Sequence, residues 1–140
     1  MMKLVLSILL FGAFAQAKTA ANVKELKTVL TQFVESAGAG QVQAAYPKLR
    51  EYFPVEQASF DKMTVDFKSE LEKYSSKYGK YESQRVFAEK SLGDDLQRVT
   101  YMMKYSTHPT MVDFYLYKTK AGWIVDSMYW NSNTKTFFVE

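Results

Sequence analysis

Two aspartates, Asp113 and Asp126, are the residues of this chain whose type and spacing best suit acid–base chemistry. If Lys118 pairs with Trp123 across a short turn, both carboxylates lie on one face of a hairpin. On that register they are diagonal neighbours about 7–8 Å apart. Paired carboxylates divide the roles of acid and base when their environments separate their pKa values. Two solvated strand residues would show the same pattern, so both interpretations stay open.

The single histidine, His108, precedes Pro109 in a predicted turn between two strands. An ordinary histidine pKa suits proton transfer near neutral pH. The turn position nevertheless favours a solvent-exposed residue, and no activated serine accompanies it to form a triad. The chain has no cysteine, which excludes disulfides, thiolate metal sites, a cysteine nucleophile and a lipid-modified cysteine. The sequence therefore predicts no metal site and no cofactor, and it leaves enzymatic activity uncertain.

Aromatic side chains suggest a different kind of site, an apolar pocket lined with phenol groups. Such pockets bind small amphipathic molecules, whose orientation the hydroxyl groups fix. A filled hydrophobic core would show the same residues. Arg85 could hold an acidic group of the ligand or form a surface ion pair. The candidate ligand-binding residues are Tyr46, Phe67, Tyr74, Tyr101, Met103 and Tyr105.

The same hairpin register places large aromatic residues and methionine on the face that carries the two aspartates. Aromatic residues and methionine are enriched in protein interfaces, and a second copy of the chain is the simplest partner. A half-exposed sheet surface is the plain alternative. The candidate interface residues are Tyr115, Tyr117, Met128 and Trp130.

Three amphipathic helices are predicted in the first half of the chain. Apolar residues recur at three- and four-residue steps over Asn22–Ala37, from Gln41 to about Phe53, and from about Glu56 to Tyr78. Glycines follow the first and third segments and favour helix ends there. Pro47 is predicted to kink or divide the second helix.

After the third helix the composition changes to alternating residues rich in Val, Tyr, Phe and Thr, which is typical of strands. Four strands are predicted, at about Tyr81–Lys90, Leu96–Thr107, Met111–Lys118 and Trp123–Asn131. Helices followed by hairpin-linked strands indicate an α+β fold. We expect N-terminal helices packed on a curved antiparallel sheet of four or slightly more strands, which together form a cone.

The first 17 residues predict export. Lys3 precedes an apolar run over residues 4–15, and residues 15–17 form a small-x-small cleavage site. We expect a cleaved signal peptide, a single domain over residues 18–140, no later membrane span, and a periplasmic or secreted protein. The formal net charge is +3 with the two signs interspersed, which gives no indication of nucleic-acid binding.

Three segments, in this order of elements, resemble a known superfamily: Phe33–Gly38 at the end of the first helix, Gly79 with Ser83–Arg85 at the first strand, and Phe114–Lys118 turning through Gly122 into Trp123–Val125. The resemblance is to the nuclear transport factor 2-like superfamily (NTF2-like), particularly its small exported bacterial domains of unknown function. It implies a cone around a pocket, used in some relatives for catalysis and in others for binding or dimerisation.

The expected function is an exported, non-enzymatic domain that binds a small apolar or amphipathic ligand or another protein. The alternative that the resemblance implies is an isomerase- or dehydratase-like enzyme, with Asp113 or Asp126 as general base and a pocket tyrosine polarising a carbonyl. That alternative requires a carboxylate inside the cone.

Overall fold

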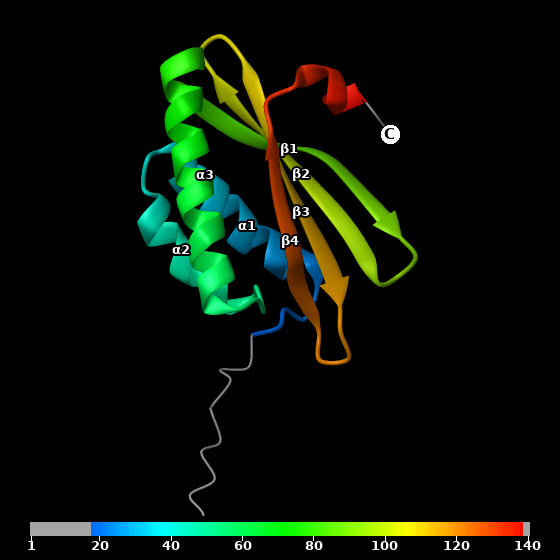
Figure 1. The fold of residues 1–140 in the computed structure, drawn as a ribbon. Helices are drawn as coiled ribbons and strands as arrows, with labels where there is room; N and C mark the ends of the chain where they lie inside the picture. Colours follow the sequence, from blue (N-terminus) through cyan, green and yellow to red (C-terminus); the bar gives the residue numbers. More distant parts are fainter. Residues whose placement is uncertain (1–17, 139–140) are drawn as a thin grey trace, which may run out of the picture.

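Helices come first along the chain and strands follow (Figure 1). The computed structural model describes residues 18–138, so the predicted signal at residues 1–17 lies outside the described residues. The elements are α1 (Val23–Gly38), α2 (Val42–Glu51), α3 (Gln57–Tyr78), β1 (Tyr81–Leu92), β2 (Leu96–Tyr105), β3 (Pro109–Lys118), β4 (Trp123–Asn131) and the 3₁₀ helix η1 (Thr134–Phe138). The predicted order of helices and strands is confirmed, while η1 was not predicted.

Helix α1 begins at a pair of reciprocal side-chain caps. The Asn22 side chain accepts a hydrogen bond from the Glu25 N–H at 2.8 Å, and the Glu25 carboxylate accepts one from the Ala21 N–H at 3.0 Å. The first bond satisfies an N–H group that the first helical turn leaves without a partner, and the second holds the residue before the N-cap. The apolar stripe is buried as its spacing predicts, through Leu26, Val29, Leu30, Phe33, Val34 and Ala37.

Helix α2 continues through Pro47 and is not divided there. Because proline has no N–H, the Gln43 carbonyl loses the donor that a helix normally supplies four residues later. The loop after α2 is held by Arg50, whose guanidinium donates to the Phe53 carbonyl and, at 2.7 Å, to the Val55 carbonyl. Arg50 thus fixes the connection that returns the chain into α3.

The four strands form one antiparallel sheet in the order β1-β2-β3-β4, and the helices cover one of its faces (Figure 1). We call this the inner face and the opposite one the outer face. On the inner face Tyr101 of β2 hydrogen-bonds Thr31 of α1 at 2.8 Å, and the ring of Phe114 in β3 meets Phe33 of α1 edge to face. The predicted fold class is confirmed.

A β-bulge in β4 changes the predicted faces of the last hairpin. Lys118 pairs with Trp123 as predicted, and Leu116 pairs with Val125, but Asp126 is an extra residue without a partner of its own. Successive strand residues point to opposite faces, so one extra residue moves every later side chain to the other face. The predicted faces of the hairpin are therefore correct for the residues before Asp126 and reversed for the residues after it.

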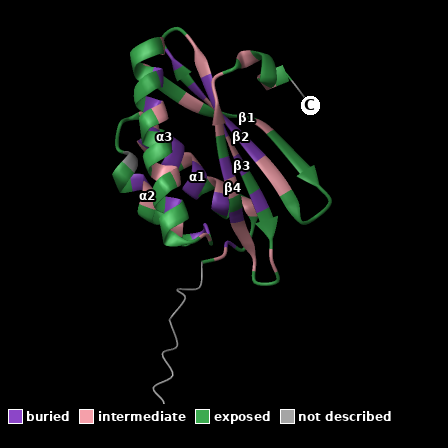
Figure 2. Cartoon of the chain, in the orientation of Figure 1, coloured by how far each residue is buried: buried purple, intermediate pink, exposed green. Residues whose placement is uncertain are grey.

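The buried residues lie between the helices and the inner face of the sheet (Figure 2). Aromatic rings dominate this core and join elements that are far apart in the sequence. Phe33 of α1 is 5.8 Å from Phe67 of α3, and Phe67 is 5.0 Å from Trp130 of β4, between ring centroids. The largest fully buried side chains are Tyr52, Tyr101, Phe33, Phe67 and Phe114.

The segment before α1 lies against the edge of β4. Ala20 and Trp123 exchange backbone hydrogen bonds of 2.9 and 2.8 Å, which pairs part of an otherwise open strand edge. Gly122 permits this approach, because a Cβ there would lie 2.6 Å from the Ala20 carbonyl oxygen and its φ is +142°. No helix within residues 18–138 has the length and apolar character needed to cross a membrane.

Candidate functional site

The two candidate catalytic carboxylates do not enter the cone. Asp113 lies on the outer face, since its neighbours Val112 and Phe114 are buried on the inner face, and it accepts a hydrogen bond from Thr100. Asp126 is exposed at the bulge. Neither aspartate therefore supplies a general base inside the cone. The enzyme alternative requires a carboxylate there, and that expectation was wrong for both Asp113 and Asp126. Within residues 18–138, no group of three His, Asp or Glu side chains is arranged to hold a metal ion.

His108 has structural contacts at the predicted turn. Its ring stacks on Tyr78 with centroids 4.3 Å apart, and its Nε2 is 2.8 Å from the Ser132 carbonyl oxygen. The ring is half-buried, which differs from the expected exposed position, because α3 and the segment after β4 meet at this turn. These contacts connect three parts of the fold and give the histidine a structural role.

Five of the six candidate ligand-binding residues are buried in the core. Tyr101 donates to the Lys27 carbonyl at 3.3 Å in addition to its bond with Thr31, and Tyr105 meets Tyr74 edge to face. Burial raises the pKa of Tyr105 to about 12. These side chains fill the space between helices and sheet, and their role in ligand binding stays a prediction. The five are Phe67, Tyr74, Tyr101, Met103 and Tyr105.

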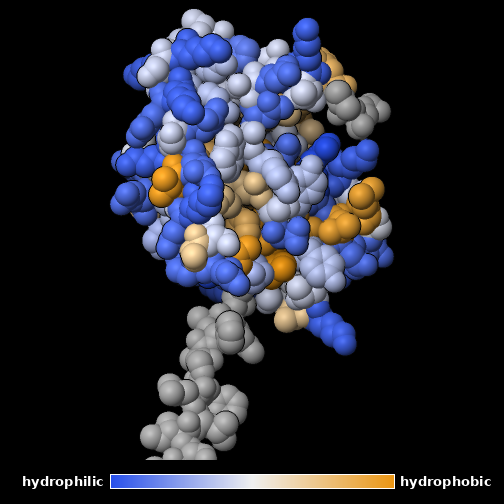
Figure 3. All heavy atoms as spheres, in the orientation of Figure 1, coloured by the Kyte–Doolittle hydropathy of each residue, from blue (hydrophilic) through white to orange (hydrophobic). Residues whose placement is uncertain are grey.

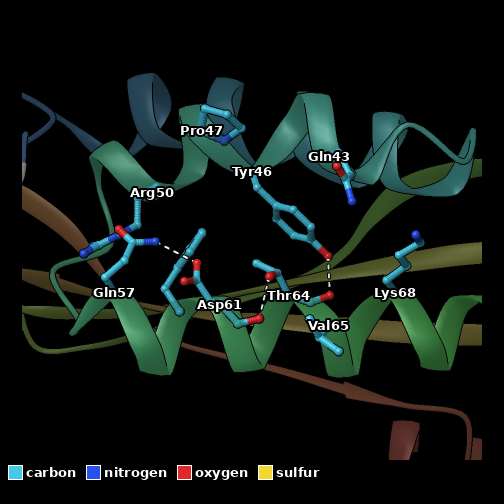
Figure 4. A pocket seen from close by; sticks show the side chains of 10 residues that line it. Gln43, Tyr46, Pro47, Arg50, Gln57, Asp61, Thr64, Val65 and Lys68 are labelled. Atoms are coloured by element: carbon cyan, nitrogen blue, oxygen red, sulfur yellow. Dashed lines mark hydrogen bonds between the residues drawn. The ribbon is translucent and has the colours of Figure 1, made fainter.

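The sixth candidate, Tyr46, lines a cavity of about 310 Å³ between α2 and α3 (Figure 4). Its hydroxyl donates to the Thr64 carbonyl at 2.8 Å, and burial raises its pKa above the ordinary tyrosine value. The cavity, which we call the helix groove, lies outside the cone because only helix residues line it. Those residues are Gln43, Tyr46, Pro47, Arg50, Gln57, Phe60, Asp61, Thr64, Val65 and Lys68.

Cationic side chains distinguish the helix groove from the aromatic core. The Arg50 guanidinium lies over the Phe60 ring, 5.3 Å from its centroid, and the Nε contacts Gln57 at 3.4 Å. Lys68 forms no salt bridge among residues 18–138. The Asp61 carboxylate accepts a bond from the Gln57 amide at 2.7 Å. Sequence reasoning missed these residues, because they became neighbours only through the packing of α2 on α3.

The outer face of the sheet carries large exposed side chains. Tyr115 and Tyr129 contact each other edge to face with centroids 5.7 Å apart, and Tyr129 is 61% exposed. Figure 3 shows hydrophobic side chains gathered where the β1–β2 turn lies in Figure 1. We call the exposed hydrophobic residues of this face the outer patch: Leu92, Leu96, Tyr115, Tyr117 and Tyr129.

Only two of the four candidate interface residues belong to the outer patch. Tyr115 and Tyr117 are exposed there, as predicted. The predicted shared face was wrong for Met128 and Trp130, because they follow the bulge and lie on the inner face. Met128 is buried and Trp130 contacts Phe67. The bulge instead brings Tyr129 to the outer face.

Trp130→Ala is therefore expected to destabilise the fold by about 2–3 kcal/mol and to leave the outer face unchanged, because the indole is half-buried against Phe67. Urea unfolding followed by circular dichroism measures the first effect, and sedimentation measures any change in self-association. A variant that stays fully stable but loses self-association would return Trp130 to the interface.

No protein-family model matches the chain, and no curated protein matches it in sequence. Two solved structures are similar. One is a Campylobacter jejuni protein proposed to be an NTF2-like transpeptidase, at 10% identity and a TM-score of 0.51, covering 76% of this chain and 99% of that one. The other is the intermembrane space region of the chloroplast protein ARC6, at 7% identity and a TM-score of 0.43, covering 81% and 99%. The first likeness shows the fold alone: this chain has the NTF2-like fold that its sequence resembles.

Proposed function

We propose that the protein is an exported, non-enzymatic interaction domain that pairs with a second copy of itself through the outer face of the sheet. The observation that carries the proposal is the outer patch, a set of large exposed hydrophobic side chains on a sheet face that the three long helices leave uncovered. Contiguous patches of this kind mark interaction sites. Export is supported by the composition of residues 1–17.

Charge on the outer face favours a second copy as the partner. Cationic residues lie on β1 and β2, and acidic residues lie on β3 and β4. None of these side chains forms a salt bridge among residues 18–138. A two-fold axis parallel to the strands reverses the strand order, which sets the basic half of one copy on the acidic half of the other. The charged residues are Arg85, Lys90, Arg98, Lys104, Asp113 and Asp126.

The sheet register gives this pairing specific contacts. Lys90, Arg98, Tyr115 and Ser127 form one row across the four strands. Reversing the row about its centre sets Lys90 of one copy opposite Asp126, next to Ser127, of the other. It also sets Arg98 opposite Tyr115, which suits a cation–π contact.

The area of the outer face is sufficient for such a dimer. Strand spacing near 4.8 Å and a rise near 3.3 Å per residue give roughly 20 by 30 Å, or about 600 Å² on each copy. A dimer would then bury about 1,200 Å² in total, above the approximately 1,000 Å² that a specific interface needs. The buried core favours this interaction over the ligand-binding alternative, because five of the six candidate ligand-binding residues are buried within one hydrophobic cluster.

Sedimentation equilibrium of protein expressed from the full sequence tests the proposal. We expect a dimer, and Tyr117→Glu is expected to weaken it at least about 100-fold, because two-fold symmetry buries the new charge twice. Ser76→Glu, which adds the same charge to the exposed side of α3, is the matched control and should associate like wild type. A wild-type monomer at about 100 μM would contradict the proposal.

The orientation of the two copies has its own test. Lys90→Glu and Asp126→Lys are each expected to weaken the dimer, since either one places like charges opposite each other. The double variant restores opposite charges and should recover most of the affinity. If the double variant loses as much binding free energy as the two single variants together, this orientation is excluded, while the outer patch remains an interface.

A further inference from the structure

The three residues 18–20 are hydrogen-bonded into the fold one after another. The Lys18 N–H donates to the Glu51 carbonyl at the end of α2 at 2.6 Å. The Thr19 hydroxyl donates to a carbonyl of the β3–β4 turn at 3.1 Å, and the fully buried Ala20 pairs with Trp123 of β4. Segments outside the helices and strands at the ends of a domain are poorly ordered unless contacts of this kind hold them. Residues 18–20 therefore form a short strap that joins α2 to β4.

The backbone nitrogen of Lys18 lies at the negative end of α2. The last carbonyls of a helix have no donor inside the helix, and the aligned peptide dipoles make this end partly negative. The carbonyls of Leu49 and Arg50 accept N–H groups from the loop that follows, at 3.1 and 3.2 Å. The Glu51 carbonyl, the last of the helix, takes its donor from Lys18 instead. A positive charge on this nitrogen would be stabilised there.

Lys18 also contacts this end of α2 through its side chain. The Glu51 carboxylate lies 3.9 Å from the Lys18 Nζ and 3.5 Å from the Lys48 Nζ. Tyr52 is the largest cause of a raised pKa for the Lys18 side chain, and its ring centroid lies 5.4 Å from the Nζ. Glu51 and, more weakly, Glu25 raise that pKa as well. The surroundings thus favour the positive form of an amine, even with the second lysine present.

We propose that Lys18 is the first residue of the mature protein and that its α-ammonium binds the C-terminal end of α2, so that removal of the signal stabilises the fold. The inference rests on the export in the proposed function and on the cleavage site predicted at residues 15–17. A signal peptidase that hydrolyses the Ala17–Lys18 peptide bond consumes one water and leaves a carboxylate on Ala17 and an ammonium on Lys18. The neutral N–H donor at the Glu51 carbonyl thereby becomes a charged donor, and charge-assisted hydrogen bonds are roughly twice as strong as neutral ones.

The first residue of the mature protein is tested by expressing the full sequence in an exporting bacterium and measuring the intact mass of the purified protein. We expect the mass of residues 18–140. A protein that keeps residues 1–17 would contradict export and this inference together. A processed protein that begins at another residue would overturn the assignment of Lys18 while leaving export in place.

The binding of the α-ammonium to α2 is tested by comparing the mature chain with the same chain carrying one acetyl group on the α-amine. Acetylation removes the charge but keeps an N–H donor for the Glu51 carbonyl, as in the precursor. Urea unfolding at pH 7 should give an unfolding equilibrium constant about fivefold larger for the acetylated chain. Equal constants would overturn this binding and leave export and cleavage unaffected.

The matched control is a chain that keeps Ala17 in front of Lys18. Its α-ammonium lies one residue away from the nitrogen that contacts α2, so acetylation should change its unfolding constant less than about twofold. An equal response of the two chains would show a general effect of charge and overturn the assignment to the end of α2.

The pH dependence of this difference separates the charge from the shape of the acetyl group. An ordinary α-amine has a pKa of about 7.7–8.0. A fold that favours the ammonium gains stability below that pH and loses the gain as the pH rises through the folded value. The fivefold difference should therefore be present at pH 7 and absent by about pH 10, since side-chain titration is common to both chains. A difference that persists unchanged at pH 10 would overturn the role of the charge.

Discussion

Phe33→Ala is expected to lower the free energy of unfolding by about 4 kcal/mol, a large fraction of the 5–15 kcal/mol typical of a domain. The ring is 1% exposed and meets three other rings, with centroid distances of 5.6 Å to Tyr46, 5.8 Å to Phe67 and 6.0 Å to Phe114. These rings come from α2, α3 and β3, so alanine leaves a cavity where four elements meet. Urea unfolding followed by circular dichroism measures the change.

Phe138→Ala is the matched control for Phe33→Ala. It removes the same side chain from η1, where the ring is 83% exposed, and should change the free energy of unfolding by no more than about 0.5 kcal/mol. Phe33→Leu keeps most of the buried volume and should cost less than half as much as alanine. A loss below about 1 kcal/mol for Phe33→Ala would mean that the neighbouring rings collapse into the space, and that this cluster does not organise the core.

The helices, the strands and the first part of the last hairpin could be predicted because they depend on local patterns. The spacing of Leu26, Leu30 and Phe33 gives α1 its buried stripe, and alternation gives β2 and β3 their two faces. The Lys118–Trp123 pairing also follows locally, since a short turn fixes the register beside it.

The bulge at Asp126 could not be predicted in the same way, because distant contacts accompany it. The N–H of Val125, just before the bulge, donates to the Tyr52 carbonyl at the end of α2, and Ala20 pairs with Trp123 two residues earlier. Strand β4 is thus hydrogen-bonded to the end of α2 near its start and packs Trp130 on α3 near its end. The alternation of residues in β4 alone does not indicate that these contacts need a bulge.

The candidate sites likewise divide into residues that local patterns predict and residues that only distant contacts bring together. Tyr115 and Tyr117 were correctly expected on an exposed face, because they precede the bulge. The helix groove was missed, since Arg50 and Lys68 belong to separate helices whose charged residues resemble ordinary solvated ones in the sequence. Pro47 was the one local signal, because a proline inside a helix leaves a carbonyl free.

Stability is expected to fall steeply as the pH rises above 10, because the folded protein keeps phenols neutral that the unfolded chain ionises. Burial raises the pKa of Tyr105 to about 12, and it raises the pKa of Tyr74 and Tyr101 as well. Above the unfolded value near 10, the unfolded state binds fewer protons than the folded state, so increasing pH favours unfolding. Each such tyrosine costs about 1.4 kcal/mol per pH unit until its folded pKa is reached.

Urea unfolding of wild type and Tyr105→Phe at pH 7, 8, 9, 10, 11 and 12 separates this contribution from lysine titration, which is common to both proteins. Tyr105 is 5% exposed, and between pH 10 and 12 its phenol should account for about 3 kcal/mol of the loss. The difference in stability between the two proteins should therefore shift in favour of phenylalanine across that interval and stay constant below pH 9. Parallel curves for wild type and Tyr105→Phe would show that water reaches this phenol in the folded protein. The buried core, on which the preference for an interaction function over ligand binding depends, would then have to be abandoned.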